Sequence, residues 1–381
     1  MTSIVGSFIG RLIGVSGVIP EPEGPHKVIG TTMFRFPGSV LAQVFYPGDE
    51  SSTPSAMPHK YVRKEALDGL GNWTGQPASL FYNWCNTKHP FKRDIAVKSL
   101  GKKLPIFIFS HGLGGNSEIY SKVCSDIASF GYVVIACEHE DGSASFAYPE
   151  GAVEPLLYIR PNFEYTRENV LAFREPHLEI RKHEIQKVIE FLIPQQSVAV
   201  DDVALENDTG YSPSQVEGSF SKVIDSVNID EIWLAGHSFG GATVVSASKD
   251  DRISKLIKGT IALDIWPMPL NDHILETGLQ IPFLSINTQQ FYDGHEVELT
   301  RKLISNSSSA THAFYVPGTA HMQYSDMPFL TRQFLAKKIY SVGTCKKEDS
   351  QRAIIRAIVH FMESPDTSWE TILKEESLVH L

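Results

Sequence analysis

The sequence predicts an α/β fold in which a mostly parallel central sheet is covered by helices on both faces. From about residue 40 onward, short β-branched runs alternate with amphipathic helical runs, which is typical of parallel strands joined by helical crossovers. The 381 residues are 42% hydrophobic and 20% charged, as in ordinary globular proteins. No internal repeat is evident, so a repeat architecture is not expected.

The individual elements follow from the period of their apolar residues. Apolar, β-branched runs predict strands at residues 40–46, 105–109, 132–136, 232–235, 260–263, 282–286 and 312–316. Amphipathic runs predict helices at residues 118–129, 177–192, 241–247, 294–304, 328–339 and 351–361. The run at 177–192 keeps the helical period through Leu178, Ile185, Val188, Ile189 and Leu192.

We expect one domain over residues 24–381 that carries two lid-like insertions. The first, near 59–92, is rich in Trp, Tyr and Phe without a clear period, so it is either a lid over a pocket or an irregular packed insertion. The second, near 195–228, is polar and rich in Ser, Asp and Gly, which predicts a long surface insertion.

An apolar leader at residues 1–23 precedes this domain. It is too short and too rich in glycine to span a bilayer, and it has no basic segment before its apolar stretch, as a secretory signal would. Two interpretations stay open: a disordered or loosely docked leader, and a helix that lies in a membrane interface.

Composition and motif searches exclude several classes of function. The net charge is −10 and no basic tract stands out, so we expect no nucleic-acid partner. Cys124 and Cys137 lie in apolar stretches, so we predict that they are buried thiols. The spacing of the cysteines resembles neither a disulfide framework nor a zinc site. His139-Glu140 lacks the second histidine of a metalloprotease, and no nucleotide-binding glycine motif is present, so no metal or cofactor is expected.

The motif that carries chemistry is Gly236-His237-Ser238-Phe239-Gly240, which lies between an apolar strand and a helical run. This G-x-S-x-G pattern in a strand–turn–helix context is typical of a nucleophile elbow. The sharp turn predicts a strained serine, and glycines at 236 and 240 remove the Cβ atoms that would clash there. We therefore predict that Ser238 is a nucleophile.

A serine becomes reactive only when a base takes its proton and an acid orients that base. Asp264 ends the apolar strand 260–263, where a carboxylate needs a partner, and we predict that it is the orienting acid. Its rivals, Asp272 and Asp293, lie in loop-like sequence.

The same reasoning places the base in the loop after the last predicted strand. His321 follows the strand 312–316, from which it can reach over the sheet edge to the serine, so we predict that it is the base. The other candidates are less suited: His312 begins its strand, His360 lies inside a helix, His273 and His295 fall in surface-like segments, and His237 is expected to pack away from Ser238.

An oxyanion hole needs two backbone N–H donors. The first should be Phe239, which follows the nucleophile. The second should be Leu113, because Ser110-His111-Gly112-Leu113-Gly114-Gly115 follows a predicted strand and is similar to an H-G-G-G-type oxyanion loop. A plain glycine turn is the alternative for that loop.

These motifs stand in a longer series of short segments. The series is Gly24-Pro25-His26 with Val28 and Gly30, Phe45-Tyr46-Pro47, Phe109 to Gly114, Glu138-His139 with Ser143-Ala144-Ser145, Gly236 to Gly241, Ile261 to Asp264 with Trp266, and Gly318 with His321. In this order, over about residues 24–365, the chain resembles the plasma and cytosolic type II platelet-activating-factor acetylhydrolases, also called lipoprotein-associated or group VII phospholipases A2.

This resemblance implies an α/β-hydrolase fold and a calcium-independent serine esterase without a cofactor. Such an enzyme would hydrolyse the sn-2 acetyl or short acyl ester of platelet-activating factor and related phosphocholine lipids to a lyso lipid and a carboxylate. The family's triad falls on Ser238, Asp264 and His321 and its oxyanion donors on Leu113 and Phe239, in agreement with the choices above. Trp266 and Phe291 fall where family members have pocket aromatics, with core packing as the alternative.

Two other functions stay open from the sequence. One is a general short-chain carboxylesterase or lipase without a preference for phospholipids. The other is a catalytically silent hydrolase fold that binds a ligand or partner, against which the complete set of triad residues argues.

The resemblance also implies contact with a lipid surface. Residues 328–339 combine apolar side chains with cations at their edge, namely Phe329, Leu330, Phe334, Leu335, Arg332, Lys337 and Lys338. They suit either a peripheral interfacial helix or an ordinary amphipathic core helix. Neither the plasma member's signal peptide nor the cytosolic member's acylated glycine is evident, so we expect a cytoplasmic protein with peripheral membrane contact, and secretion stays an alternative.

Overall fold

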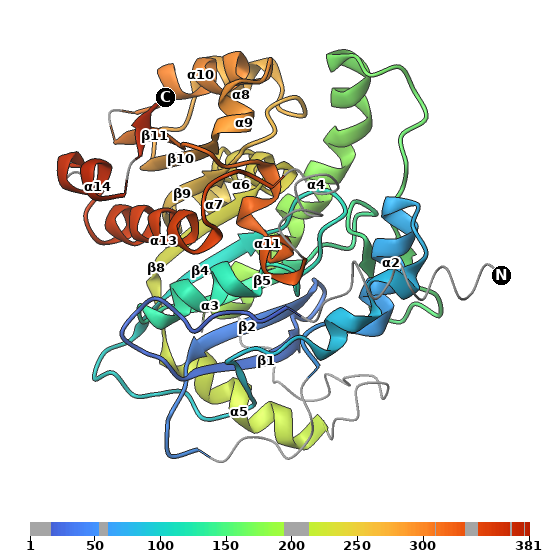
Figure 1. Cartoon of the computed structure of the whole chain (residues 1–381), viewed down its shortest axis with the longest axis vertical. Helices are drawn as coiled ribbons and strands as arrows, with labels where there is room; N and C mark the ends of the chain where they lie inside the picture. The colour runs from blue at the N-terminus through green and yellow to red at the C-terminus, as the bar shows by residue number, and fades with distance from the viewer. Residues whose placement is uncertain are drawn as a thin grey trace.

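A ten-stranded sheet forms the centre of the protein, with helices on both of its faces (Figure 1). The computed structural model describes residues 17–52, 60–193, 213–308, 310–331, 342–365, 368–376 and 378–381. The strand order is β12-β11-β10-β9-β8-β4-β5-β2-β1-β3, and β6 and β7 form a separate two-stranded ribbon.

The six strands in the middle of the order, β11 to β5, are parallel, and antiparallel pairs flank them as β5–β2, β2–β1 and β11–β12. The sheet is therefore mostly parallel, as the sequence predicts. The strands are β1 (Ile29–Arg35), β2 (Leu41–Pro47), β3 (Lys92–Arg93), β4 (Leu104–Ser110), β5 (Val133–Glu138), β6 (Phe146–Ala147), β7 (Leu156–Leu157), β8 (Val227–His237), β9 (Ile257–Leu263), β10 (Phe283–Thr288), β11 (Thr311–Val316) and β12 (Val379–His380).

The helices connect these strands and cover them. They are α2 (Lys64–Thr74), α3 (Ser121–Ser129), α4 (Arg167–Leu192), α5 (Pro213–Ser226), α6 (Phe239–Ser248), α7 (Asp251–Ser254), α8 (Asp272–Thr277), α9 (Gln289–Tyr292), α10 (Val297–Ser305), α11 (Met327–Leu330), α13 (Lys347–Glu363) and α14 (Glu370–Glu375), with short 3₁₀ turns η1 (Ala78–Leu80), η2 (Tyr82–Asn86) and η4 (His321–Tyr324).

The core lies on both faces of the sheet because successive strand residues point in opposite directions. In β4, Phe107 and Phe109 pack into the apolar cluster that holds α3 and α13. Ile106 and Ile108 pack into the cluster on the other face, with α4 and α5. Figure 1 shows α3 and α13 on one face and α4 and α6 on the other.

The predicted strands coincide with β2, β4, β5, β8, β9, β10 and β11, whereas several other elements differ from the prediction. The helix predicted at 177–192 begins ten residues earlier, at Arg167, and continues through Pro176. Strand β1 was not predicted, since its sequence contains Gly30, Thr31 and Thr32 rather than a continuous apolar run.

The first predicted insertion, near 59–92, contains α2, η1, η2 and β3. Leu67, Leu70 and Trp84 from this segment are buried in the core, while Trp73 lines the cavity described below. Parts of one segment thus serve both the packing and the cavity.

The segment near 195–228, predicted to be a surface insertion, contains regular structure in its second half. Residues 194–212 lie outside the described residues, but 213–226 form α5 and β8 begins at Val227. Phe220 and Val223 of α5 are buried against the sheet, because their spacing places them on one side of the helix.

The possible lipid-binding helix at 328–339 is described only in part. Within α11, Phe329 and Leu330 are buried in the core, which favours core packing for these two residues, and residues 332–341 lie outside the described residues. Most of the leader, residues 1–16, also lies outside them. Among the described helices, none combines the length and the apolar character needed to cross a bilayer.

Candidate active site

Ser238 lies at a sharp turn between β8 and α6. Its backbone has φ 57° and ψ −117°, a conformation that non-glycine residues rarely adopt. A Cβ atom on Gly236 would lie 2.2 Å from the carbonyl oxygen of Gly240, and one on Gly240 would lie 2.0 Å from that of Ser110. Only glycine fits at either position, as the sequence predicts.

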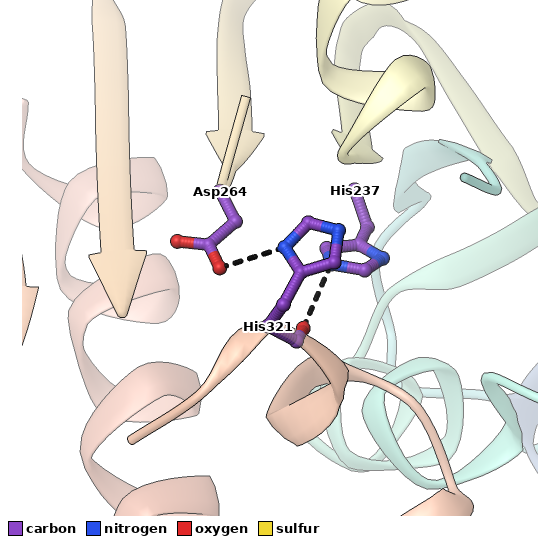
Figure 2. Close-up of side chains that lie close together, drawn as sticks. All are labelled: His237, Asp264 and His321. Atoms are coloured by element: carbon purple, nitrogen blue, oxygen red, sulfur yellow. Dashed lines mark hydrogen bonds and ion pairs between the residues drawn. The ribbon is translucent and has the colours of Figure 1, made fainter. Parts of the chain in front are cut away.

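The structure brings Ser238, His321 and Asp264 together at the carboxyl ends of the parallel strands. The Oγ of Ser238 lies 3.0 Å from Nε2 of His321, and Nδ1 of His321 lies 3.0 Å from Oδ2 of Asp264. Figure 2 shows the imidazole of His321 turned toward the Asp264 carboxylate. A carboxylate that accepts Nδ1–H leaves Nε2 to accept the serine proton.

The carboxylate of Asp264 is fully buried and firmly held. Asp264 follows the last residue of β9 and has a left-handed φ of 44°. Its Oδ2 accepts a hydrogen bond of 2.7 Å from the hydroxyl of Thr288, the last residue of β10, and its Oδ1 accepts one from the Thr288 N–H. Two donors from a neighbouring strand end therefore fix the carboxylate that faces His321.

The backbone of His321 is held on both sides. Its N–H donates to Oε1 of Gln290 at 2.9 Å, and its carbonyl oxygen accepts from Nε2 of His237 at 3.0 Å, the second contact drawn in Figure 2. The His237 ring in turn lies 2.9 Å from the Tyr120 hydroxyl through Nδ1. His237 therefore does more than pack, because it positions the loop that carries His321.

His237 is neutral in this environment. Burial, with the nearby His321 as a second cause, lowers the pKa of His237 well below its usual value. A neutral imidazole that donates from Nε2 must accept at Nδ1, so the Tyr120 hydroxyl is the donor in that contact.

Asp272, Asp293, His312 and His360 do not line the cavity that contains Ser238, whereas the exposed His295 does. Asp272 is an exposed residue at the start of α8 that pairs with Arg167 at 2.9 Å. Asp293 directly follows α9 and is exposed. His312 donates a hydrogen bond to the carbonyl oxygen of Pro365, and His360 lies in α13.

The loop 110–115 passes directly beside the serine. A Cβ atom on Gly112 would lie 3.1 Å from Cβ of Ser238. Leu113 lines the cavity into which Ser238 opens. Phe239 is the first residue of α6, so its N–H belongs to the helix-terminal donors that have no partner within the helix.

Buried charges hold this loop. Arg181 of α4 donates to the carbonyl oxygen of His111 at 2.7 Å and pairs with Asp141 at 2.9 Å, and both charged side chains are fully buried. Arg181 also donates to the Ser143 hydroxyl at 2.6 Å, and the Ser143 carbonyl accepts from the N–H of Gly114 at 2.8 Å.

The pKa values of the groups around Arg181 are set by their burial and by the positive charge of Arg181. Burial together with Arg181 lowers the pKa of His111 to about 3. Burial alone would raise the pKa of Asp141, but Arg181 and the Ser143 hydrogen bonds hold it below its usual value. The pair is therefore ionised inside the protein.

The serine opens into a cavity of about 920 Å³ whose walls are largely apolar. Its lining includes Trp73, Leu113, Tyr158, Phe163, Tyr165, Trp266, Met268, Phe291, Leu299 and Met322. Both aromatic residues predicted for the pocket, Trp266 and Phe291, are among them. The ring of Phe291 is nearly parallel to that of His321, with 6.2 Å between the ring centroids.

Several polar residues of the site were missed by the sequence analysis, among them Tyr120, Arg181 and Gln290. Thr288 holds Asp264, Arg174 lies in the cavity wall, and Glu296 accepts hydrogen bonds from Trp266 at 3.3 Å and Tyr165 at 3.4 Å. Burial raises the pKa of Glu296. Only Thr288 carried a usable signal, since it ends a predicted strand beside the one that leads to Asp264.

His237, Asp264 and His321 also offer three ligand atoms within 4.8 Å of one another, which a metal ion could use. In this structure Nδ1 of His321 is hydrogen-bonded to Asp264, and Nε2 of His237 donates a hydrogen bond to the His321 carbonyl oxygen. These contacts suit an oriented imidazole that transfers a proton, and a metal ion would have to replace both.

A model of the family "Platelet-activating factor acetylhydrolase, isoform II" matches residues 15–376. Platelet-activating factor acetylhydrolase of Gallus gallus is 30% identical over 340 residues, which cover 84% of this chain and 76% of the relative. The protein of the same name from Canis lupus familiaris is 29% identical over 324 residues, covering 82% and 69%.

Among solved structures, a ferulic acid esterase from Streptomyces cinnamoneus has a TM-score of 0.64 and covers 92% of this chain, with 93% of that chain covered in turn. At 16% identity this likeness shows the fold, an α/β hydrolase. The family match spans nearly the whole chain, so the protein belongs to the platelet-activating factor acetylhydrolase isoform II family of hydrolases.

Proposed function

We propose that this protein is a serine esterase of the phospholipase A2 type, in which Ser238 is the nucleophile, His321 the base and Asp264 the orienting acid. The observation that carries the proposal is the pair of 3.0 Å contacts that join Ser238 to His321 and His321 to Asp264. The substrate we propose is a phosphocholine lipid with an acetyl or short acyl ester at sn-2, as in platelet-activating factor. Membership of the family and the largely apolar cavity support this choice.

Acylation begins when the Ser238 Oγ attacks the sn-2 carbonyl carbon and its proton moves to Nε2 of His321. The carbonyl electron pair moves to oxygen, where the N–H groups of Leu113 and Phe239 are the proposed donors. When the tetrahedral intermediate collapses, the C–O bond to the glycerol breaks. The leaving oxygen takes the proton from His321 and departs as the lyso lipid.

Deacylation repeats the sequence with water. His321 accepts a proton from water as the water oxygen attacks the acyl carbon, and the proton then returns to Ser238 when the ester bond breaks. The products are the carboxylic acid and free enzyme. Asp264 keeps the proton on Nδ1 throughout and stabilises the charged imidazole.

The decisive variant is Ser238→Ala. We expect kcat for an acetyl ester to fall by about 10⁴-fold or more, with the melting temperature nearly unchanged. Ser246→Ala, in the same helix, is the matched control and should keep its activity. Turnover by Ser238→Ala at the level of the control would overturn the assignment, and failure of a fluorophosphonate probe to label Ser238 in the wild type would instead favour a silent binding protein.

The substrate class needs a separate measurement. We expect a higher kcat/KM for 1-alkyl-2-acetyl-glycerophosphocholine than for the matching neutral 1-alkyl-2-acetyl-glycerol, and the same rates with and without a chelator. Equal kcat/KM values for the two esters would instead support a general short-chain carboxylesterase. A loss of activity in the chelator would contradict the calcium-independent mechanism.

A further inference from the structure

Arg174 is a buried cation in the wall of the active-site cavity. It lies on α4, its exposed fraction is 2%, and it lines the same cavity as Ser238. Within the described residues, its Nη1 has no hydrogen-bond partner and no carboxylate lies close enough to form an ion pair with it. A buried charge without a counterion is costly, so its presence beside a binding cavity calls for an explanation.

The surroundings of Arg174 stabilise its charge only in part. Its guanidinium carbon lies 4.7 Å from the ring centroid of Phe173 and 5.7 Å from that of Phe239, distances at which ring faces attract a cation. The nearby carboxylate of Asp141 is engaged by Arg181 at 2.9 Å. Burial accordingly lowers the pKa of Arg174. The site is therefore positive and lacks an anion.

Tyr158 connects this charge to the cavity. The Nη2 of Arg174 donates to the Tyr158 hydroxyl at 2.6 Å, and Tyr158 is half-buried and lines the cavity. Because that hydroxyl oxygen accepts from a cation, its own hydrogen is what it can offer to a group in the cavity. A hydroxyl polarised in this way is a stronger donor to an anion than an isolated tyrosine.

We propose that Arg174 and Tyr158 form a subsite that binds an anionic oxygen group of the substrate. The inference rests on the proposed function, because it assigns a role within the same cavity. For a phosphocholine lipid the group is the phosphate of the headgroup. The same chemistry also fits a carboxylate at the far end of a short acyl chain, so the experiment must separate the two sources.

The opposite charge is present in the same lining. Glu296 accepts from the indole N–H of Trp266 and from the Tyr165 hydroxyl, and all three residues border the cavity. A carboxylate beside two aromatic side chains suits a quaternary ammonium group. A zwitterionic headgroup therefore meets both signs of charge in one cavity, which an uncharged ester would not use.

The test compares three esters on Arg174→Gln, Arg174→Lys and Tyr158→Phe. The first ester is 1-alkyl-2-acetyl-glycerophosphocholine, the second is 1-alkyl-2-acetyl-glycerol, and the third is the same neutral glycerol with a glutaryl group at sn-2. We expect Arg174→Gln to lower the kcat/KM ratio of the phosphocholine or glutaryl ester to the neutral ester by roughly 10- to 100-fold, through KM. Arg174→Lys should lose less, and Tyr158→Phe about 3- to 10-fold.

The three esters identify the source of the anion. A fall in the ratio for the phosphocholine ester assigns the subsite to the headgroup, and a fall for the glutaryl ester assigns it to the acyl chain. Arg167→Gln, on the same helix but paired with exposed Asp272, is the matched control and should leave both ratios unchanged. Equal losses on all three esters, or no loss in either ratio, would overturn the subsite.

A binding measurement separates this inference from the proposed function. Glycerophosphocholine should inhibit hydrolysis of the neutral ester competitively in the wild type, and its inhibition constant should rise at least 10-fold in Arg174→Gln. Equal inhibition of both proteins would refute a headgroup subsite even if phosphocholine esters are good substrates, and the subsite as a whole would fail if the glutaryl ratio were also unchanged. If the wild type ignores phosphocholine esters but shows this difference in inhibition, the subsite stands and the proposed substrate fails.

Discussion

The two sides of Ser238 are held in place by different physics. On one side, Asp264 and His321 are fixed by hydrogen bonds to Thr288 and to the neutral His237. On the other side, the loop 110–115 is fixed by the buried ion pair of Arg181 and Asp141. A lost hydrogen bond costs much less than an unpaired buried charge. Substitutions on the first side should therefore affect reactivity, and those on the second should affect stability as well.

The largest effect is expected from Asp264→Asn. The amide keeps the shape of the side chain but favours the wrong tautomer of His321, so kcat should fall by about 10⁴-fold while the melting temperature changes little. The exposed carboxylate of Asp272 provides the control variant, Asp272→Asn, which should stay active. A kcat within tenfold of the wild type would show that His321 does not depend on Asp264.

Arg181→Met tests the side of Ser238 that is held by the buried ion pair. The variant leaves Asp141 buried without its partner, so the free energy of unfolding should fall by about 3–5 kcal/mol in urea titrations. The double variant Arg181→Met with Asp141→Asn removes both charges and should recover part of this loss. If the single variant were as stable as the wild type, the proposed difference between the two sides would disappear.

A smaller effect is expected from Thr288→Val on the hydrogen-bonded side. The variant removes the hydroxyl that donates to Asp264 at 2.7 Å but keeps the backbone donor. We expect kcat to fall by roughly tenfold with KM unchanged, which corresponds to one hydrogen bond to a charged group. Thr288→Ser restores the hydroxyl and should restore kcat. An unfolding free energy reduced as much as in Arg181→Met would contradict the comparison.

The smallest effect concerns one buried acid on the His321 side. Asp326 accepts from the backbone N–H groups of Ser121 and Lys122 at 2.8 and 2.9 Å, and it accepts from the Tyr61 hydroxyl. It thereby joins the segment after His321 to the start of α3. Burial raises the pKa of Asp326 from 3.8 to about 6.

The sign of the pH effect follows from this shift. Between about pH 4 and pH 6 the folded protein binds the Asp326 proton more tightly than the unfolded chain, so this group makes stability fall as the pH rises through that window. Asp326→Asn lacks this titration. As the pH rises from 4 to 6, the unfolding free energy of the wild type should therefore fall relative to that of the variant. A difference that stays constant with pH would contradict the assignment.

The sequence was sufficient for the central strands and for the residues that follow them. Each strand in the middle of the sheet contains a short run of mostly apolar residues, and Ser238, Asp264 and His321 come after such runs. Because parallel strands end at one edge, sequence position alone brings these side chains close together. The turn glycines were predictable for the same local reason.

The remaining residues depend on contacts that have no local signature. Arg174 lies two residues before Pro176, in a segment that the sequence does not predict to be helical. The reason is that a proline removes a backbone donor and crowds the preceding turn. Its partner Tyr158 lies in a separate loop, and Arg181 meets Asp141 across 40 positions of sequence. Long-range pairs of this kind arise from the packing of α4 against the sheet, which periodicity does not reveal.

The ends of the central sheet have a consequence for how the chain avoids self-association. The outermost strands, β12 and β3, are two residues long each, whereas their neighbours β11 and β1 span six and seven residues. A short edge offers few unpaired backbone groups to a second molecule, which protects a broad sheet against edge-to-edge aggregation. A design that lengthened either edge strand would therefore expose more unpaired backbone groups and would risk assembly into fibres.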